Sequence, residues 1–302
     1  MKISEAKVFF CSAGCGFASA LSKASGCALS SIKVGRFSDG ELFASVEEEV
    51  HGRQCVLIQS VSAPANDNLM ELLLAADALK RAAAASVIAV VPYLGYCRQD
   101  KRNKQESIAA KLVANIMVKS GIDEVFTVDL HSKQIEGFFD VPVYCISGVP
   151  VFADYFKKTG FSADEFVVVA PDFGAVRRAR ELASILGCDI AIVDKHRPKA
   201  NVSEVMNVIG EVNGKNLIIV DDIIDTAGTV CNASFELMER GARGIYVCAS
   251  HAVLSGSAEK KIEKSMIKEM IFLNTIEIPA HKMIDKFKIL DVSLLVAREF
   301  FR

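Results

Sequence analysis

The sequence predicts an α/β protein made of two similar doubly wound domains with mostly parallel sheets. Short apolar runs recur between segments of helical periodicity, and several runs are rich in Val and Ile without alternation. Strands have this sequence pattern when helices cover both faces of a parallel sheet. A chain of 302 residues is also longer than one core comfortably supports, so two domains are expected.

The apolar runs give the predicted strands. They are Val8–Cys11, Cys55–Gln59, Val87–Val91, Val125–Val128, Val167–Ala170, Ile190–Val193, Leu217–Val220 and Ile245–Ala249. Helices are predicted between them at Asp67–Ala84, Ser107–Ser120, Val176–Leu186 and Thr229–Arg240. Asn66 or Asp67 can cap the first helix, and glycines follow the other three. This alternation is typical of a doubly wound fold.

The best domain boundary lies near Gly148–Pro150, where one strand–helix alternation closes and a new one begins. We therefore expect an N-terminal α/β domain over residues 1–148 and a C-terminal α/β domain over residues 149–302. The last helix could pack back on the N-terminal domain.

Composition and charge exclude several classes of protein. The net charge of -2 and the lack of a long basic run argue against a nucleic-acid partner. No window has the roughly 20 apolar residues of a membrane helix, and the apolar stretch near the N-terminus is too short for a signal peptide. The nine cysteines are scattered with no CxxC, which excludes a zinc ribbon and fits a reducing compartment. We expect a cytoplasmic protein without a membrane partner.

The most informative motif is NLIIVDDIIDTAGT at residues 216–229. A buried strand leads into Asp221 and Asp222, and a short loop then leads into a helix. The loop's backbone N–H groups and the helix N-terminus can bind an anion, and carboxylates at the strand end suit sugar hydroxyls or a metal. The loop residues are Asp225, Thr226, Ala227, Gly228 and Thr229. Gly228 would let the backbone approach a phosphate closely, and the two threonines add hydroxyl donors.

The motif therefore predicts a pentose-phosphate site. A capped βα turn with acidic surface residues is the alternative, and it would be preferred for the two carboxylates alone. The complete strand–loop–helix unit resembles the ribose-phosphate loop of the phosphoribosyltransferase superfamily, which implies a phosphoribosyltransferase-like fold.

Further segments resemble the ribose-phosphate diphosphokinase family, most closely its bacterial class I type, and the resemblance covers nearly the whole chain. These segments are Gly35–Glu41, Pro92–Arg102, Val128–Phe139, Val168–Arg180 and Asp194–Gly210. Read alone, each has a plainer interpretation as a polar turn, a solvated charge run or a satisfied turn histidine.

The resemblance assigns ATP binding to the N-terminal domain. Phe37 would stack on adenine, and Asp39 and Glu41 would hydrogen-bond the base of an ATP bound largely by a neighbouring subunit. Arg98 and Gln99 match the family's nucleotide-binding pair, and Asp100, Lys101 and Arg102 would begin a mobile loop. His131 matches a histidine that contacts the metal–nucleotide unit; Mg²⁺ prefers oxygen ligands, so direct ligation by this histidine stays open.

In the C-terminal domain, the resemblance implies a diphosphate loop made of Asp172, Phe173, Gly174, Ala175 and Arg178. Asp172, with His131, would serve magnesium. Lys195 and Arg197 match the cations of a catalytic flexible loop. Ala175 and Ala227 stand where the family often has glycine, and the segment Asn103–Ser107 is shorter than its counterpart.

The reaction implied is Mg²⁺-dependent transfer of the β,γ-diphosphate of ATP to the 1-hydroxyl of ribose 5-phosphate, giving 5-phosphoribosyl 1-diphosphate and AMP. A homo-oligomer is expected, with a hexamer favoured over a tetramer or a dimer. A phosphoribosyltransferase is an alternative, but it would not explain the segments around Phe37 and Arg98. A non-catalytic regulatory subunit is another, although such relatives usually lose the cationic or metal-site residues that this chain retains.

Overall fold

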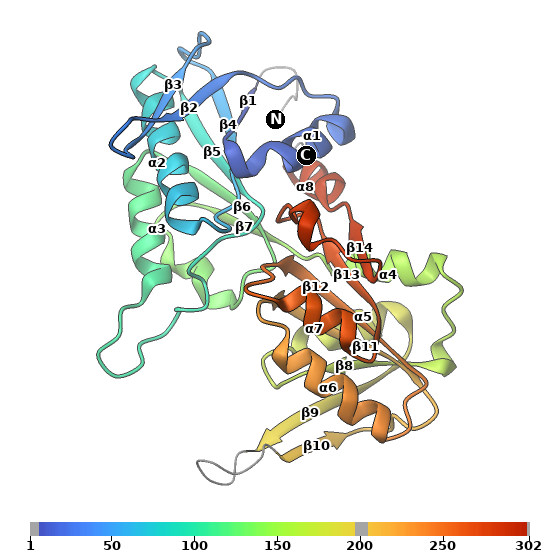
Figure 1. Cartoon of the computed structure of the whole chain (residues 1–302). Coiled ribbons are helices and arrows are strands. Elements are labelled where there is room, and N and C mark those ends of the chain that lie inside the picture. Colours follow the sequence, from blue (N-terminus) through green and yellow to red (C-terminus); the bar gives the residue numbers. More distant parts are fainter. Residues whose placement is uncertain (1–5, 197–204, 301–302) are drawn as a thin grey trace. The chain divides into compact units, whose positions relative to one another are not determined.

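Figure 1 shows the computed structural model, which describes residues 6–196 and 205–300. The chain forms two compact units. Unit 1 takes the chain up to residue 147, together with 274–277 and the segment from 291 onward, and unit 2 takes 148–273 and 278–290. None of the described helices is long and apolar enough to cross a bilayer.

The centre of unit 1 is a five-stranded sheet in the order β1-β4-β5-β6-β7, and every neighbouring pair is parallel. The strands are β1 (Lys7–Phe10), β4 (Gln54–Ile58), β5 (Ser86–Val91), β6 (Glu124–Val128) and β7 (Val143–Ile146). Because they are parallel, the loops that follow β4, β5 and β6 leave from one edge of the sheet, where α/β proteins place their sites.

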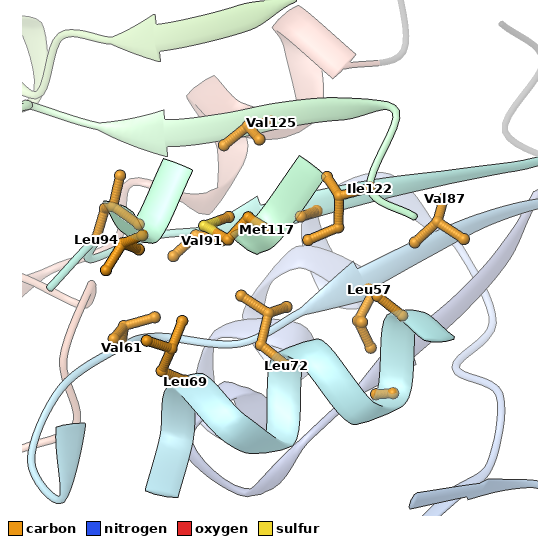
Figure 2. Packing of buried hydrophobic residues seen from close by; sticks show 14 of the residues in the cluster. Leu57, Val61, Leu69, Leu72, Val87, Val91, Leu94, Met117, Ile122 and Val125 are labelled. Atoms are coloured by element: carbon orange, nitrogen blue, oxygen red, sulfur yellow. The ribbon is translucent and has the colours of Figure 1, made fainter. Parts of the chain in front are cut away.

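Helices cover both faces of this sheet. The helices are α1 (Cys15–Ser25), α2 (Ala65–Arg81), α3 (Ala109–Lys119) and α8 (Ser293–Phe300), with 3-10 turns at Ser12–Gly14 and Lys133–Phe138. Figure 2 shows Leu72 of α2 and Met117 of α3 packed with the strand residue Val125 in one apolar cluster. The next strand residue, Phe126, points to the other face, where its ring lies 5.1 Å from that of Phe300 in α8.

A small antiparallel hairpin of β2 (Ile32–Arg36) and β3 (Leu42–Val46) completes unit 1. Its loop spans residues 37–41, and the strand β3 packs against α2.

Unit 2 contains a seven-stranded sheet in the order β10-β9-β8-β11-β12-β13-β14, parallel except for β10. The strands are β8 (Phe166–Ala170), β9 (Asp189–His196), β10 (Val205–Ile209), β11 (Asn216–Ile224), β12 (Gly244–Ala252), β13 (Ile267–Leu273) and β14 (Phe287–Leu290). Its helices are α4 (Val149–Lys158), α5 (Val176–Leu186), α6 (Gly228–Glu239) and α7 (Ala258–Lys264), with 3-10 turns at Ala163–Glu165 and Ala280–Lys282.

The α/β class, the mostly parallel sheets and all eight predicted strands are confirmed, with small differences at the ends. The strands β2, β3, β7, β10, β13 and β14 were not predicted from the sequence. The strands β2 and β7 are short or only half-buried, so their apolar pattern is weak, whereas β13 is a mostly buried strand of seven residues. The predicted cap of α2 is wrong: the helix begins at Ala65 with Pro64 at the N-cap position and no side-chain cap. Asn66 and Asp67 instead bond to other segments, as described below.

Candidate active site

The order of strands in unit 2 creates a switch point between β8 and β11. After β8 the chain continues to β9 on one side, and it later returns to place β11 on the other side of β8. Asp172 lies two residues beyond the end of β8, while Asp221 and Asp222 lie in the last part of β11. Open α/β sheets bind ligands outside the carboxyl ends of strands at such a point, because the two following loops diverge there.

The loop after β11 has the backbone conformation of an anion site. Ala227 has φ +59° and ψ 2°, in the left-handed region, and α6 begins at the next residue, Gly228. The first backbone bond of this helix runs from Cys231 N–H to the Ala227 carbonyl, and no side chain among the described residues caps it. A left-handed residue directly before a helix N-terminus turns successive N–H groups toward one concave side.

Gly228 is not needed by the fold itself. A Cβ added at this position would meet only the Thr226 Oγ1, at 3.9 Å, which is ordinary van der Waals contact. Its φ is also outside the left-handed region that favours glycine. The free space at Gly228 therefore supports the interpretation that a group from outside the chain approaches the backbone here.

The carboxylates at the end of β11 are crowded. The Asp222 N–H donates to Asp221 Oδ1 at 2.9 Å, and the Asp222 carboxylate lies 3.8 Å from the Arg178 guanidinium. Burial raises the pKa of Asp221 well above its ordinary value, and the negative charges of Asp222 and Asp172 raise it further. A cation or a hydroxyl donor that binds beside these carboxylates would stabilise their ionised forms.

The loop after β8 exposes its first residues and buries its end. Phe173 is 63% exposed, whereas Ala175 and Arg178 are buried. The Ala175 N–H donates to Asp172 Oδ1 at 3.1 Å and so orients that carboxylate. Ala175 has φ -83°, so the methyl group that replaces the family's glycine causes no backbone strain.

Lys195 lies on the part of β9 that extends beyond β8. The register of the two strands ends with Ala170 opposite Ile192, whereas β9 continues to His196. The backbone of Lys195 is therefore near the same edge of the sheet as the loop of Asp172. The side chain of Lys195, and the whole of Arg197, lie outside the described residues.

In unit 1, Asp100 joins the loops that follow β5 and β6. Its carboxylate accepts hydrogen bonds from Ser132 Oγ at 2.6 Å and from Gln134 Nε2 at 2.9 Å. These contacts bring the predicted nucleotide residues Arg98 and Gln99 to the same edge as His131, and all three are exposed. The loop that was predicted to be mobile thus begins at a buried, bonded side chain, Asp100, and continues into the exposed residues Lys101 and Arg102.

The hairpin loop that carries Phe37, Asp39 and Glu41 is closed by its own backbone. Phe37 N–H donates to the Glu41 carbonyl at 2.8 Å, and Asp39 accepts from the Glu41 N–H at 3.1 Å. The Phe37 ring packs 4.9 Å from the Phe43 ring yet remains 56% exposed. An aromatic face thus stays accessible, as base stacking would require.

The start of α2 connects this hairpin to the loop after β5. Arg36, at the base of the hairpin, bonds Asp67 at 2.7 Å, and the Tyr96 hydroxyl donates to the side chain of Asn66. Sequence reasoning treated Asn66 and Asp67 only as helix caps and gave Tyr96 no role. A signal that could have found them is the cluster of polar side chains directly after the predicted strand Cys55–Gln59.

Three residues other than glycine adopt positive φ in the predicted site loops: Tyr96, Asp129 and Ala227, at 66°, 40° and 59°. Each such conformation costs free energy, and strain of this kind concentrates at functional sites.

The donor set fits magnesium better than a softer metal. Asp172 presents an exposed carboxylate at the switch point, and one of its oxygens accepts the Ala175 N–H. Within the described ranges there is no group of three His, Cys, Asp or Glu side chains placed to hold an ion. Mg²⁺ commonly binds through one or two carboxylates together with substrate phosphates and water, so the chemistry of a site with one carboxylate is compatible with this ion.

The chain is similar to known proteins over nearly its whole length. Residues 6–121 match the family model described as the N-terminal domain of ribose phosphate pyrophosphokinase, and residues 193–302 match that of the phosphoribosyl synthetase-associated domain. A ribose-phosphate pyrophosphokinase from Fusobacterium nucleatum is 46% identical over 100% of this chain and 96% of its own length. One from Clostridium tetani is 51% identical over 92% of this chain and 87% of its own length.

A solved structure shows the same fold over nearly the whole chain. The phosphoribosylpyrophosphate synthetase from Mycobacterium smegmatis superposes with a TM-score of 0.91 at 35% identity, covering 98% of this chain and 97% of that chain. The sequence identity, the coverage of both chains and the shared fold together show that this chain belongs to the ribose-phosphate pyrophosphokinase family.

Proposed function

We propose that this protein is a ribose-phosphate diphosphokinase. It transfers the β,γ-diphosphate of ATP to the 1-hydroxyl of ribose 5-phosphate, giving 5-phosphoribosyl 1-diphosphate and AMP. The observation that carries the proposal is the switch point in unit 2, where the loop of Asp172 and the loop that follows Asp222 leave neighbouring strands. Family membership supports the same reaction.

The loop after β11 holds the sugar phosphate in this proposal. The backbone N–H groups at residues 227–229 and the hydroxyls of Thr226 and Thr229 bind the 5-phosphate. Asp221 and Asp222 accept hydrogen bonds from the ribose hydroxyls and so fix the direction of the attacking 1-hydroxyl. This positioning matters because diphosphoryl transfer needs in-line geometry more than covalent help.

The loop of residues 172–175, followed by Arg178 at the start of α5, receives the diphosphate. Asp172 would hold Mg²⁺. His131 is a second candidate residue for contacting the Mg²⁺–nucleotide complex. When bound, the ion neutralises phosphate oxygens during the transfer. A Cβ at Gly174 would come within 3.1 Å of Asp172 Oδ1, so glycine leaves room for this carboxylate, and the bonded Ala175 N–H keeps it in place.

Unit 1 binds ATP in this proposal. Phe37 stacks on adenine, Asp39 and Glu41 hydrogen-bond the base, and Arg98 with Gln99 contacts the nucleotide. The family places this hairpin in a neighbouring subunit's site, so we propose that the active form is a homo-oligomer. A hexamer is the favoured assembly.

Lys195 and Arg197 are the proposed catalytic cations, assisted by Arg98. Each neutralises charge that develops on the transferred diphosphate, and one well-placed donor of this kind is worth about 3 kcal/mol.

The test is an assay of purified protein with ATP, Mg²⁺ and ribose 5-phosphate, in which AMP and ADP are separated by chromatography. AMP that forms only with the sugar phosphate supports the proposal. ADP would indicate an ordinary kinase, and no turnover by a folded, assembled protein would favour the regulatory-subunit alternative. AMP formation also separates this enzyme from a phosphoribosyltransferase, which does not cleave ATP.

A further inference from the structure

Lys261, in helix α7, contacts the phosphate loop from outside. Its Nζ donates to the main-chain carbonyl of Thr226 at 3.1 Å, across 35 residues of sequence. The helices α6 and α7 pack together, which places the side chain beside the loop that precedes α6. The sequence of the loop does not indicate that Lys261 contacts it.

Three consecutive main-chain carbonyls, from the last residue of β11 into the loop, accept hydrogen bonds. The Leu254 N–H donates to the Ile224 carbonyl at 3.0 Å, and the Ser255 N–H donates to the Asp225 carbonyl at 3.1 Å. Lys261 supplies the donor to the third, that of Thr226. Only this third donor belongs to a side chain, so only this one can be removed by substitution without altering the backbone.

The contact to Thr226 sets the direction of the next N–H group. In a planar trans peptide the C=O and the N–H point in opposite directions. A carbonyl of Thr226 held toward Lys261 therefore directs the Ala227 N–H away from it. The same peptide leads into Ala227 at φ +59°, a left-handed conformation that is unfavourable for a residue with a Cβ. A hydrogen bond from a charged donor is stronger than a neutral one and offsets part of this cost.

We propose that Lys261 is a positioning residue of the phosphate loop. It holds the Thr226–Ala227 peptide in the orientation in which the Ala227 N–H joins those of Gly228 and Thr229 toward the 5-phosphate of the sugar substrate. This inference rests on the proposed function, because it assigns Lys261 to the same site. Lys261 acts through the backbone of the loop.

The test compares Lys261→Met, which keeps the length of the side chain but removes the donor, with Lys261→Arg, which keeps a donor and a charge. We expect Lys261→Met to raise the Kd and the KM for ribose 5-phosphate about tenfold while kcat and the KM for ATP stay within twofold. Lys261→Arg should restore most of the affinity. The matched control is Lys260→Met, an exposed neighbour on the same helix, which should behave as wild type.

A second substitution tests the backbone argument. Glycine adopts the left-handed region without penalty. Lys261→Met should therefore raise the Kd for ribose 5-phosphate threefold or less when it is made in an Ala227→Gly protein. An equal loss in both backgrounds, an unchanged Kd in Lys261→Met, or a parallel rise in the KM for ATP would overturn the assignment.

A measurement without substrate keeps the inference testable by itself. Amide hydrogen exchange in the peptide covering residues 225–231 should be faster in Lys261→Met than in Lys260→Met, because the loop loses its anchor. Equal exchange in both variants would count against the positioning role. Failure of the wild-type protein to bind ribose 5-phosphate would instead remove the proposed function, so the two failures are distinguishable.

Discussion

The guanidinium of Arg178 lies 3.8 Å from the carboxylate of Asp222, and both side chains are about nine-tenths buried. Arg178 comes from α5, which follows the loop of Asp172, whereas Asp222 belongs to β11. The pair therefore connects the two loops of the switch point. It also gives Arg178 a structural role in addition to its proposed place in the diphosphate loop.

Replacing Arg178 with Met should destabilise the protein. The substitution leaves Asp222 as a buried carboxylate without its cationic neighbour, and breaking a buried pair in this way costs about 3 kcal/mol. Urea denaturation measures the change. Arg177→Met, at the exposed neighbouring position, is the control and should change the free energy of unfolding by no more than about 0.5 kcal/mol. Similar values for both variants would show that the ion pair adds nothing to stability.

Lys195→Ala should lower kcat by about 100-fold or more, because it removes a cation proposed to act only in the transition state. The affinity for ribose 5-phosphate should stay nearly intact. Asp222→Asn should show the opposite pattern, in which the affinity for ribose 5-phosphate falls more than the affinity for ATP. Steady-state kinetics with each substrate varied in turn separates the two. If Lys195→Ala weakened substrate binding as much as turnover, Lys195 would be a binding residue only.

Ala227 and Ala175 provide a matched pair for the cost of the left-handed backbone. Both are buried and both precede a helix in a site loop, but φ is +59° at Ala227 and -83° at Ala175. Ala175→Gly should lower the free energy of unfolding by about 1 kcal/mol, since it loses a buried methyl group and gains chain entropy in the unfolded state. In Ala227→Gly the relief of strain should offset those losses, leaving stability unchanged within about 0.5 kcal/mol. Chemical denaturation of both variants is the measurement, and equal losses would contradict the strain argument.

The raised pKa of Asp221 predicts a pH dependence of stability. Above the ordinary value of 3.8 the unfolded chain has released this proton while the folded chain still holds it. The folded state then binds more protons, so the free energy of unfolding falls as pH rises from about 4 until the folded-state pKa is passed. Asp221→Asn should remove this decline and gain stability relative to wild type as pH increases.

Denaturation curves between pH 4 and pH 8 check this expectation. The exposed Asp140→Asn variant controls for the loss of one negative charge. A difference between Asp221→Asn and wild type that does not change with pH would mean that the carboxylate is not perturbed by its surroundings.

Asp100→Asn should weaken the binding of ATP more than the binding of ribose 5-phosphate. The substitution keeps the shape of the side chain but loses the charge that accepts hydrogen bonds from Ser132 and Gln134, and hydrogen bonds to charged groups contribute about 1.5–3 kcal/mol. The loops of Arg98 and His131 would then be less well fixed relative to each other. A rise of about tenfold in the KM for ATP, with that for ribose 5-phosphate unchanged, is the expected result. Equal changes in both would assign Asp100 a general structural role.

Local pattern was enough to predict the α/β class and eight of the strands, and it predicts the chemistry of the loop at residues 221–229. Buried parallel strands are apolar throughout, and residues 221–229 are adjacent in sequence, so both signals lie within a short window. For the same reason the amphipathic hairpin β2–β3 and the short strand β7 were missed, because neither has a strong apolar pattern.

Tertiary structure decided which distant residues support the site. The partners of Asp222, Asp100 and Thr226 are Arg178, Ser132 and Lys261, and each is 32 or more residues away. No window of sequence contains both members of such a pair. The left-handed conformation of Ala227 could not be predicted from the sequence either, because alanine has no preference for it. The residue types of the loop thus predict phosphate chemistry, while the packing of α5 against β8 and β11, and of α7 against α6, brings Arg178 and Lys261 to their partners.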